Sequence, residues 1–369
     1  MMSTTPLLCI VTMLLQSTAA TRIRRPLSFC HIKQLSRFHR ANRLHLNRIL
    51  FDTSEIDKSD TSQNAREESD TDEAPMATFT IPKEDYRTIH IAKILGLQNG
   101  DSLRAGTVIN PSDEERDEFA GLLTDDATIT WLPEGKIKKA EPTKNGDPPG
   151  SLCISIPQPP KTYLSTQSSD EEVLDNDTPR VSLLLALPRP LQLSRILPMV
   201  SQLGVNQLIL TNAMKVPKDY FGSHIFRKPE VLRGLLVEGL AQSGDVRLPR
   251  VHVTKRLKIF MEDELDELFP PDEVVRVIAH PQRRDIDGKE VGPAPLRMTD
   301  IDFPMDGSDK PRQLLVAVGP EGGWTEPYEL DMFTSKGFQQ ITLGTRVLRS
   351  DVAVVSLLSL AHEVCSKSK

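Results

Sequence analysis

The sequence lacks paired cysteines and long apolar runs. Its four cysteines, Cys9, Cys30, Cys153 and Cys365, lie far apart and form no CxxC pair, which argues against a disulfide framework and a zinc site. No apolar run reaches the roughly 18 residues that a membrane-spanning helix needs. We therefore expect no metal and no membrane partner. The 369 residues leave room for one or two folded domains.

Acidic residues are absent from the first 51 positions, which contain eight Lys or Arg residues. An apolar stretch, PLLCIVTMLL, precedes the small residues Ser17–Ala20, and a basic, hydroxyl-rich stretch follows. This composition is typical of an organelle transit peptide. We expect residues 1–41 to be a targeting leader for the plastid, with the mitochondrion as the second choice. The alternative is a disordered basic tail.

Acidic residues dominate the next stretch, where Asp52–Pro75 has nine Asp or Glu and two Lys or Arg. Such a segment has little to bury, so we expect a disordered insertion at about 53–76. A polar stretch at 165–178 predicts a linker. The predicted domains are therefore 42–164 and 179–369. Without the first 51 residues the net charge falls from −6 to −14 (−6 − 8), which argues against an overall basic RNA-binding protein but not against a local basic patch.

The first predicted domain contains short strand candidates and turn signals. Arg48–Phe51 and Leu152–Ile156 read as strands, and Asp85–Leu97 has apolar residues near helical spacing. The turn signal Asn99–Asp101 precedes another strand candidate. These features predict a small β-barrel-like module.

The second predicted domain alternates apolar runs with amphipathic stretches. Val181–Leu187 is apolar except for Ser182, as expected for a strand covered on both faces of its sheet. Alternating strands and helices favour an α/β fold with an open parallel sheet. The predicted strands are Val181–Leu187, Gln207–Ala213, Arg250–Val253, Val274–His280, Leu314–Pro320 and Gln339–Gly344. The predicted helices are Leu191–Val205, Glu230–Gly244, Tyr328–Gly337 and Asp351–Val364.

Three loops after these strands have unusual chemistry: AHP at Ala279–Pro281, GPEGGW at Gly319–Trp324 and LGTRVLRSD at Leu343–Asp351. Ligands of open α/β sheets bind beyond the carboxyl ends of the strands. The loops match neither GxxxxGK[ST] nor GxGxxG, so a P-loop or a dinucleotide fingerprint is not supported. Any one of them could be a turn without a ligand, but the three together favour a ligand site.

GPEGGW and LGTRVLRSD resemble the signature of a SPOUT methyltransferase family that makes 3-methyluridine in small-subunit ribosomal RNA, the RsmE type. The similarity extends through Ala186–Pro190, Phe260–Leu265 and the first domain, from about Asn42 to Val364. It implies a C-terminal domain with a trefoil knot and an N-terminal PUA-like RNA-binding barrel.

The resemblance also implies that the loops hold S-adenosylmethionine, mostly through backbone groups, and that no metal is needed. For His280 a hydrogen-bonded position at a strand end is an equal alternative. The implied donor-binding residues are Ala279, His280, Pro281, Gly319, Pro320, Glu321, Gly322, Gly323, Leu343, Gly344, Arg346, Val347 and Leu348.

Methylation of uridine N3 requires loss of a weakly acidic proton and stabilisation of charge on the neighbouring carbonyl oxygens. Arg349 is the candidate for that stabilisation, because a guanidinium can donate to an oxyanion. Asp351 could orient Arg349 or accept a proton. The alternatives are a surface arginine for Arg349 and a helix N-cap for Asp351.

The chain departs from the family pattern near both catalytic and RNA-binding positions. Asp351 and Val352 stand where the family usually has Glu-Thr, so a carboxylate is kept and a hydroxyl is lost. The predicted substrate-binding residues are Arg189, Gln242, Asp245 and Arg349, whereas Ala241 and Gly244 differ from the family.

The sequence therefore predicts a methyltransferase that uses S-adenosylmethionine to form 3-methyluridine in organelle small-subunit ribosomal RNA, with the RNA or the small ribosomal subunit as partner. The alternatives are a SPOUT enzyme for another RNA or a ribose oxygen, and an inactive RNA-binding relative. Apolar residues around most of Asp351–Val364 predict a helix that is covered on more than one side. The resemblance implies that a second copy provides this cover in a homodimer, with burial inside one chain as the rival.

Overall fold

The computed structural model describes residues 48–57, 76–110, 121, 123–133, 142, 146–157, 180–285, 287–301 and 313–367. All of these lie in one compact unit, His45–Lys369. The predicted leader at 1–41 and the predicted linker at 165–178 lie outside the described residues.

A six-stranded parallel sheet dominates the second half of the chain, which confirms the predicted α/β fold. Its strand order is β11-β9-β10-β6-β7-β8, and every neighbouring pair is parallel. The strands are β6 (Val181–Ala186), β7 (Gln207–Thr211), β8 (Arg250–Thr254), β9 (Val274–Ala279), β10 (Gln313–Val318) and β11 (Gln339–Ile341).

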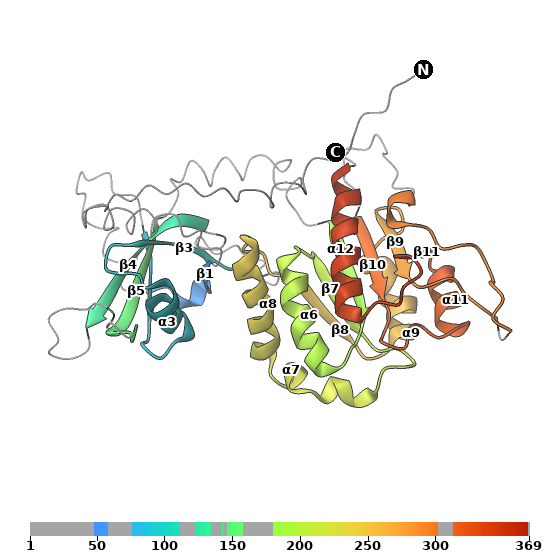
Figure 1. Ribbon diagram of the computed structural model, residues 1–369, viewed down its shortest axis with the longest axis horizontal. Helices are drawn as coiled ribbons and strands as arrows, with labels where there is room; N and C mark the ends of the chain where they lie inside the picture. Colours follow the sequence, from blue (N-terminus) through green and yellow to red (C-terminus); the bar gives the residue numbers. More distant parts are fainter. Residues whose placement is uncertain are drawn as a thin grey trace, which may run out of the picture. The chain divides into compact units, whose positions relative to one another are not determined.

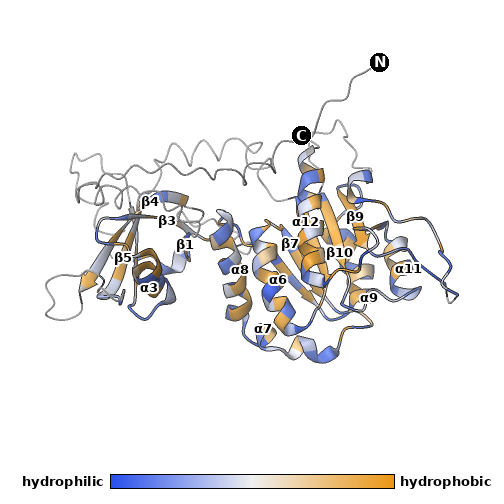
Figure 2. Ribbon diagram, viewed as in Figure 1, coloured by the Kyte–Doolittle hydropathy of each residue, from blue (hydrophilic) through white to orange (hydrophobic). Residues whose placement is uncertain are grey.

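Helices cover this sheet, which explains why its central strands are almost entirely apolar. Every residue of β6 is buried, and so are five of the six residues of β10. The helices α8 (Pro229–Ser243), α6 (Pro190–Gln202) and α12 (Ser350–Lys367) lie side by side in Figure 1, and α12 contacts β6 and β10. Figure 2 shows the apolar colour concentrated in the strands behind them. Burial on both faces removes the usual alternation of polar and apolar residues.

The remaining helical elements of this half are short. They are η3 (Lys218–Gly222), α7 (His224–Arg227), α9 (Leu257–Ile259), η4 (Phe260–Glu264), α10 (Leu265–Leu268), η5 (Met298–Asp300) and α11 (Tyr328–Ser335).

The first half contains a five-stranded, mostly antiparallel sheet in the order β1-β3-β4-β5-β2. In β5 the residues Leu152, Ile154 and Ile156 are fully buried and alternate with half-exposed ones, as expected for a sheet with one covered face. The strands are β1 (Ile49–Phe51), β2 (Met76–Ile81), β3 (Ser102–Thr107), β4 (Leu123–Pro133) and β5 (Gly150–Pro157), and the helical turns are η1 (Thr53–Glu55), α3 (Tyr86–His90) and η2 (Ile91–Leu95).

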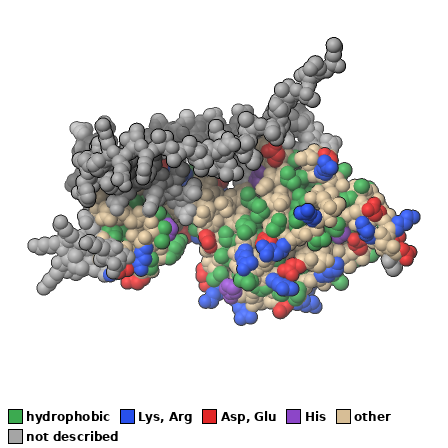
Figure 3. Space-filling model, in the orientation of Figure 1, with side chains coloured by type: hydrophobic (Ala, Val, Ile, Leu, Met, Phe, Trp, Pro, Cys, Tyr) green, Lys and Arg blue, Asp and Glu red, His purple; other side chains and the backbone are tan. Residues whose placement is uncertain are grey.

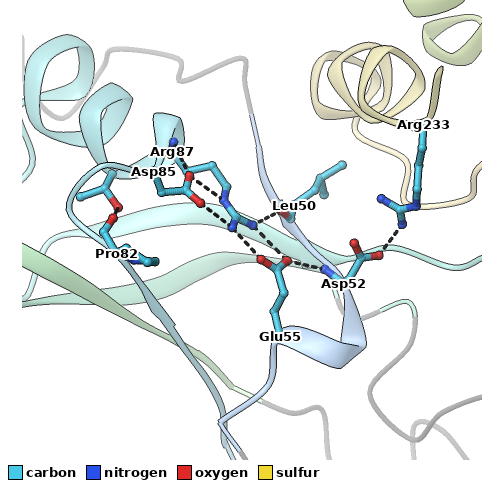
Figure 4. A network of polar contacts seen from close by, with 8 residues as sticks. Leu50, Asp52, Glu55, Pro82, Asp85, Arg87 and Arg233 are labelled. Atoms are coloured by element: carbon cyan, nitrogen blue, oxygen red, sulfur yellow. Dashed lines mark hydrogen bonds and ion pairs between the residues drawn. The ribbon is translucent and has the colours of Figure 1, made fainter. Parts of the chain in front are cut away.

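A buried arginine joins α3 to the start of this module (Figure 4). Arg87 donates to both carboxylate oxygens of Glu55, at 2.6 and 3.1 Å, and to both of Asp85, at 2.9 and 3.1 Å. It also donates to the carbonyl oxygen of Leu50 at 3.2 Å. A buried guanidinium is tolerated only when its donors are satisfied, so this network fixes β1 and η1 against α3.

The predicted disordered insertion at 53–76 therefore overlaps folded structure at both ends. Thr53–Glu55 forms η1, whose Glu55 binds Arg87, and β2 begins at Met76. The composition of the stretch is acidic, but a carboxylate paired with a buried arginine does not need to be solvated. The central part, 58–75, lies outside the described residues.

Hydrogen bonds also connect the first module to α8 and the loop that follows it. Arg48 N–H donates to the Ala241 carbonyl oxygen at 2.8 Å, and Ile109 N–H donates to that of Val246 at 2.8 Å. Arg233 of α8 donates to Asn110 Oδ1 at 2.9 Å and also pairs with Asp52. A small apolar cluster of Leu50, Val108, Leu240 and Val246 lies at the same place.

Gly239 allows α6 and α8 to approach closely, because a Cβ at this position would lie 2.0 Å from the Pro198 carbonyl oxygen. We predict that Gly239→Ala destabilises the protein by about 1–3 kcal/mol through overpacking. Gly234, in the same helix, has nothing within 4 Å of its Cβ position, so Gly234→Ala should stabilise by roughly 0.5–1 kcal/mol. Urea unfolding would measure both, and equal effects would contradict the close contact.

Candidate active site

Four loops leave the parallel sheet at one edge. They follow β11, β9, β10 and β6, which are consecutive neighbours running in one direction. Since ligands of open α/β sheets bind outside the carboxyl ends of the strands, the three sequence-predicted loops and the Pro188–Arg189 turn after β6 are brought to one place.

A cavity of about 490 Å³ lies at this edge. It joins the start of α6, the loop Gly319–Trp324 after β10 (the glycine loop) and the loop between β11 and α12. Its lining residues are Arg189, Leu191, Gln192, Glu321, Val347, Leu348, Arg349 and Ser350. Five of these eight were predicted as site residues from the sequence, so the structure brings together residues that lie up to 160 positions apart (349 − 189).

Arg189 and Glu321 form an ion pair across the mouth of this cavity. Arg189 Nε lies 3.2 Å from Glu321 Oε2, and both side chains are exposed. Exposed pairs of this kind contribute about 0–1 kcal/mol. Arg189 can therefore leave Glu321 for an anionic ligand at little cost.

Arg349 makes a bidentate ion pair with Asp351. Its Nε lies 2.7 Å from Asp351 Oδ1, and its Nη2 lies 2.5 Å from Oδ2. The Arg349 side chain is 62% exposed, whereas that of Asp351 is 7% exposed. The guanidinium thus faces the cavity from a buried carboxylate support, and this arrangement fixes its plane.

The contact with Arg349 lowers the pKa of the Asp351 carboxyl to about 2, although burial acts in the opposite direction. Both carboxylate oxygens are occupied by Arg349, and Oδ1 also accepts the Val352 N–H at 2.9 Å. A carboxylate with so low a pKa is a weak base. Of the two roles predicted for Asp351, the geometry favours orientation of Arg349 over proton acceptance.

The N-cap alternative for Asp351 is wrong. Helix α12 begins at Ser350, and the Arg349 carbonyl oxygen accepts the first helical bond, from Ala353 N–H, at 2.9 Å. Arg349 is therefore the capping position, and Asp351 lies in the first helical turn, where negative charge is favourable next to the free N–H groups.

The glycine loop turns tightly beside a buried tryptophan. Gly323 has a φ of +69° and donates its N–H to the Pro320 carbonyl oxygen at 2.8 Å. A Cβ on Gly319 would lie 3.0 Å from Nε1 of the buried Trp324. Gly323 thus needs the left-handed backbone that glycine adopts without strain, and Gly319 needs the space.

His280 is enclosed at the end of β9. Its Nδ1 lies 2.8 Å from the Pro281 carbonyl oxygen and its Nε2 lies 3.6 Å from Glu326 Oε1. Burial lowers the pKa of His280, and the side chain is 7% exposed. These contacts agree with the hydrogen-bonded strand-end position, and Ala279, His280 and Pro281 do not line the cavity.

The remaining predicted donor-binding residues lie in the same loops but outside the cavity lining. Gly344 has a φ of +108° and donates its N–H to Thr342 Oγ1 at 3.1 Å. Leu343 packs against the core, whereas Arg346 is exposed. Pro320 is buried, and Gly322 is exposed.

Gln242 and Asp245 lie elsewhere, at the C-terminal end of α8. Neither lines the cavity, and Gln242 is exposed. Asp245 binds Arg247 with both oxygens, at 3.0 and 2.9 Å, and caps the N–H of Val246 at 2.7 Å. Burial opposes ionisation of Asp245, but the bonds from Arg247 lower its pKa. Within one chain, the predicted substrate-binding residues Gln242 and Asp245 therefore lie away from the cavity.

Sequence reasoning missed two residues that connect the loops. The fully buried Glu329 accepts the Met214 N–H at 2.8 Å and the Thr325 N–H at 2.7 Å. Lys215 Nζ donates to the Gly322 carbonyl oxygen at 2.8 Å. They attach the loop after β7 to the glycine loop. Nothing in the sequence indicates the contacts of Glu329 with Met214 and of Lys215 with Gly322, because these partners are more than 100 positions apart.

Among the described residues, no group of three or more His, Cys, Asp or Glu side chains could hold a metal ion. In the same part of the chain, no helix has both the length and the apolar character needed to cross a membrane.

The fold and the cavity are those of an α/β protein with a ligand site at the carboxyl edge of its sheet. The family model described as "RNA methyltransferase domain" matches residues 176–362. The chain belongs to this family, and the resemblance inferred from its loops is confirmed.

Two relatives of this chain are named as ribosomal RNA methyltransferases. The chain is 29% identical over 217 residues to ribosomal RNA small subunit methyltransferase E of Treponema pallidum, covering 58% of this chain and 74% of that protein. It is 41% identical over 73 residues to the protein of the same name from Synechocystis sp., covering 18% and 24%.

A solved structure has the same fold. It is ribosomal RNA small subunit methyltransferase E from Neisseria gonorrhoeae bound to S-adenosyl methionine, with a TM-score of 0.52 and 16% identity over 87% of this chain and 98% of that chain.

The Arg349–Asp351 pair predicts a pH-dependent stability. Because the pKa of Asp351 is lowered from 3.8 to about 2, the pair stabilises the fold above pH 3.8 and loses this effect as the pH falls towards 2. The difference in melting temperature between the wild type and Asp351→Asn should therefore shrink over this interval. In an Arg349→Met background the difference should be nearly independent of pH. A constant difference in the wild-type background would contradict the pairing.

Proposed function

We propose that this protein transfers a methyl group from S-adenosylmethionine to N3 of a uridine in small-subunit ribosomal RNA. The family assignment and the names of its relatives support RNA methylation. The structural observation that supports methyl transfer at this site is the cavity lined by both Glu321 of the glycine loop and Arg349.

The loops fit the methyl donor. The cavity of about 490 Å³ lies in the range of small-molecule sites. Gly323 and Gly344 in the neighbouring loops have positive φ angles and no Cβ, so a ligand can approach the backbone closely there. Backbone groups of Glu321 and Leu348, which line the cavity, and of Gly322 and Gly323 beside Glu321 would hold the donor. When bound, S-adenosylmethionine supplies an electrophilic methyl group on a sulfonium.

Arg349 is the proposed catalytic residue. Its guanidinium is exposed to the cavity and fixed by Asp351, so it can donate to a uridine carbonyl oxygen as N3 loses its proton and charge spreads onto that oxygen. Preorganised donors of this kind act because they need no rearrangement as charge develops. Asp351 is a positioning residue, and its carboxylate is too weak a base to take the proton itself.

The finer features of the fold are part of the proposal. We assign the parallel-sheet domain to the knotted SPOUT type and the five-stranded module to the PUA-like type. The strand order with β6 beside β10 and the half-barrel of β1 to β5 support these assignments, together with the structural relative.

We also propose a homodimer, although fewer apolar residues of α12 support it than the sequence predicted. Apolar residues of α12 such as Val354, Leu357 and Leu358 are buried inside one chain, so the rival explanation accounts for most of the helix. Exposed apolar residues remain beside the cavity: Leu191 at 69%, Val347 at 95% and Val352 at 46%. A second copy would cover them.

Import into the plastid, with the mitochondrion as the second choice, rests on the acid-free first 51 residues. A fluorescent fusion of residues 1–51 that stays diffuse in the cytosol would reject it.

The catalytic assignment predicts that Arg349→Ala slows methyl transfer to small-subunit ribosomal RNA by about a hundredfold, the effect of losing one oxyanion donor. Donor affinity should change only slightly, because the backbone holds the donor. Arg195→Ala removes an exposed arginine of α6 outside the cavity and should keep full activity. Mass spectrometry of nucleosides gives rate and product together, and calorimetry gives donor affinity.

Full activity in Arg349→Ala would reject the assignment of the catalytic loop. A wild-type product methylated on the ribose oxygen would support the alternative SPOUT activity. Donor binding without any transfer would support an inactive relative.

The dimer predicts that light scattering at micromolar concentration gives twice the chain mass, and that Val347→Asp shifts the protein towards monomer, because it buries a charge in the interface. Exposed Val291 lies outside the cavity lining, so Val291→Asp is a matched control that should stay dimeric. A monomer mass for the wild type would count against the proposal.

A further inference from the structure

A second cavity lies at the same edge of the sheet, beyond β7 and β8. Its volume is about 340 Å³, and its lining residues are Asn212, Lys218, Phe221, Gly222 and Lys255. Asn212 follows the last residue of β7, and Lys255 follows the last residue of β8. The last residues of the two strands, Thr211 and Thr254, are partners in the sheet. Asn212 and Lys255 therefore follow the sheet at neighbouring positions.

The charged side chains that line this cavity are all positive. Two of its five lining residues are lysines and none is acidic. Both lysines are exposed, and no ion pair joins either of them to another described residue. A third cation is close, because an atom in the Cβ position of Gly222 would lie 3.8 Å from Arg227 Nη2. Figure 3 shows Lys and Arg side chains, interspersed with Asp and Glu, over the part of the surface where Figure 1 draws α7. Such a cluster attracts phosphate.

The other lining groups suit a nucleoside. Phe221 is half-buried, and its ring centroid lies 5.7 Å from that of Phe226, which steadies a ring on which a base could stack. Asn212 Oδ1 is buried without a hydrogen-bond partner among the described residues. An unpartnered buried acceptor is unfavourable, and an N–H or O–H group of a ligand could satisfy it.

This cavity is connected to the proposed active site. The loop that begins at Asn212 also contains Lys215, whose Nζ is bonded to the Gly322 carbonyl oxygen, and Met214, whose N–H is bonded to Glu329. Strand β8 is three places from β10 in the sheet, or about 14 Å at the usual strand spacing. A few nucleotides of single-stranded RNA span such a distance.

We infer that this cavity binds a backbone phosphate of the substrate RNA, a few nucleotides from the methylated uridine, with Lys218 and Lys255 on the phosphate and Phe221 against the attached nucleoside. The inference rests on the proposed function and adds a second RNA-binding subsite to it. Phosphate contacts position a nucleic acid without reading its sequence, so this subsite sets where the strand enters the active site.

The test uses the full chain and a labelled transcript of small-subunit ribosomal RNA. In Lys218→Ala/Lys255→Ala the affinity for the transcript at low salt should fall about tenfold, and the slope of log affinity against log salt should decrease by about 1 for each phosphate that the variant no longer neutralises. The KM for RNA should rise with little change in kcat, and donor affinity by calorimetry should stay unchanged. Lys218→Arg/Lys255→Arg keeps both charges and should bind almost as the wild type does.

Lys258→Ala is the matched control, because Lys258 is an exposed lysine of the same region outside the cavity. An equal loss of affinity in Lys258→Ala, or a salt slope unchanged in the double variant, would overturn the subsite. So would tight binding of free uridine monophosphate that needs both lysines while RNA affinity stays unchanged. If the wild type binds RNA through these lysines but transfers no methyl group, the proposed function fails and the subsite stands.

Discussion

Parallel pairing of six strands is the constraint on which the rest of the molecule depends. Because all six run in one direction, every loop that follows a strand emerges at the same edge. Helices must then return the chain across the faces of the sheet, and this covers β6 and β10 so completely that nearly all of their residues are apolar. The same geometry that requires a fully buried sheet therefore collects the chemically active loops in one place.

Polar contacts between loops turn this collection into a defined site. The buried Glu329 receives N–H groups from Met214 and Thr325, and Lys215 reaches Gly322. Asp351 accepts two hydrogen bonds from the Arg349 guanidinium in a similar way. In each case a side chain satisfies groups from a loop that has no regular secondary structure. Loops held in this way keep their arrangement before any ligand arrives, which is the preorganisation that electrostatic stabilisation requires.

The first module depends on a comparable contact. Arg87 is buried, and its donors reach Glu55, Asp85 and the Leu50 carbonyl oxygen (Figure 4). The acidic composition after Phe51 predicts disorder because it offers little to bury. Composition cannot indicate that one of those acids meets a buried guanidinium 32 positions later in the sequence. The boundary of the insertion was therefore beyond what local sequence could predict.

The sequence by itself determined the order of strands and helices in the second domain, because apolar runs and helical spacing are local properties of the chain. It also determined which loops are unusual, since glycine and proline restrict the backbone wherever they stand. Only the tertiary structure decided that Glu321 and Arg349 share a cavity with Arg189, that Gln242 and Asp245 do not, and that Asp351 supports Arg349 instead of capping a helix. These are contacts between side chains distant in sequence or details of where a helix begins, and both depend on how strands pair and helices pack.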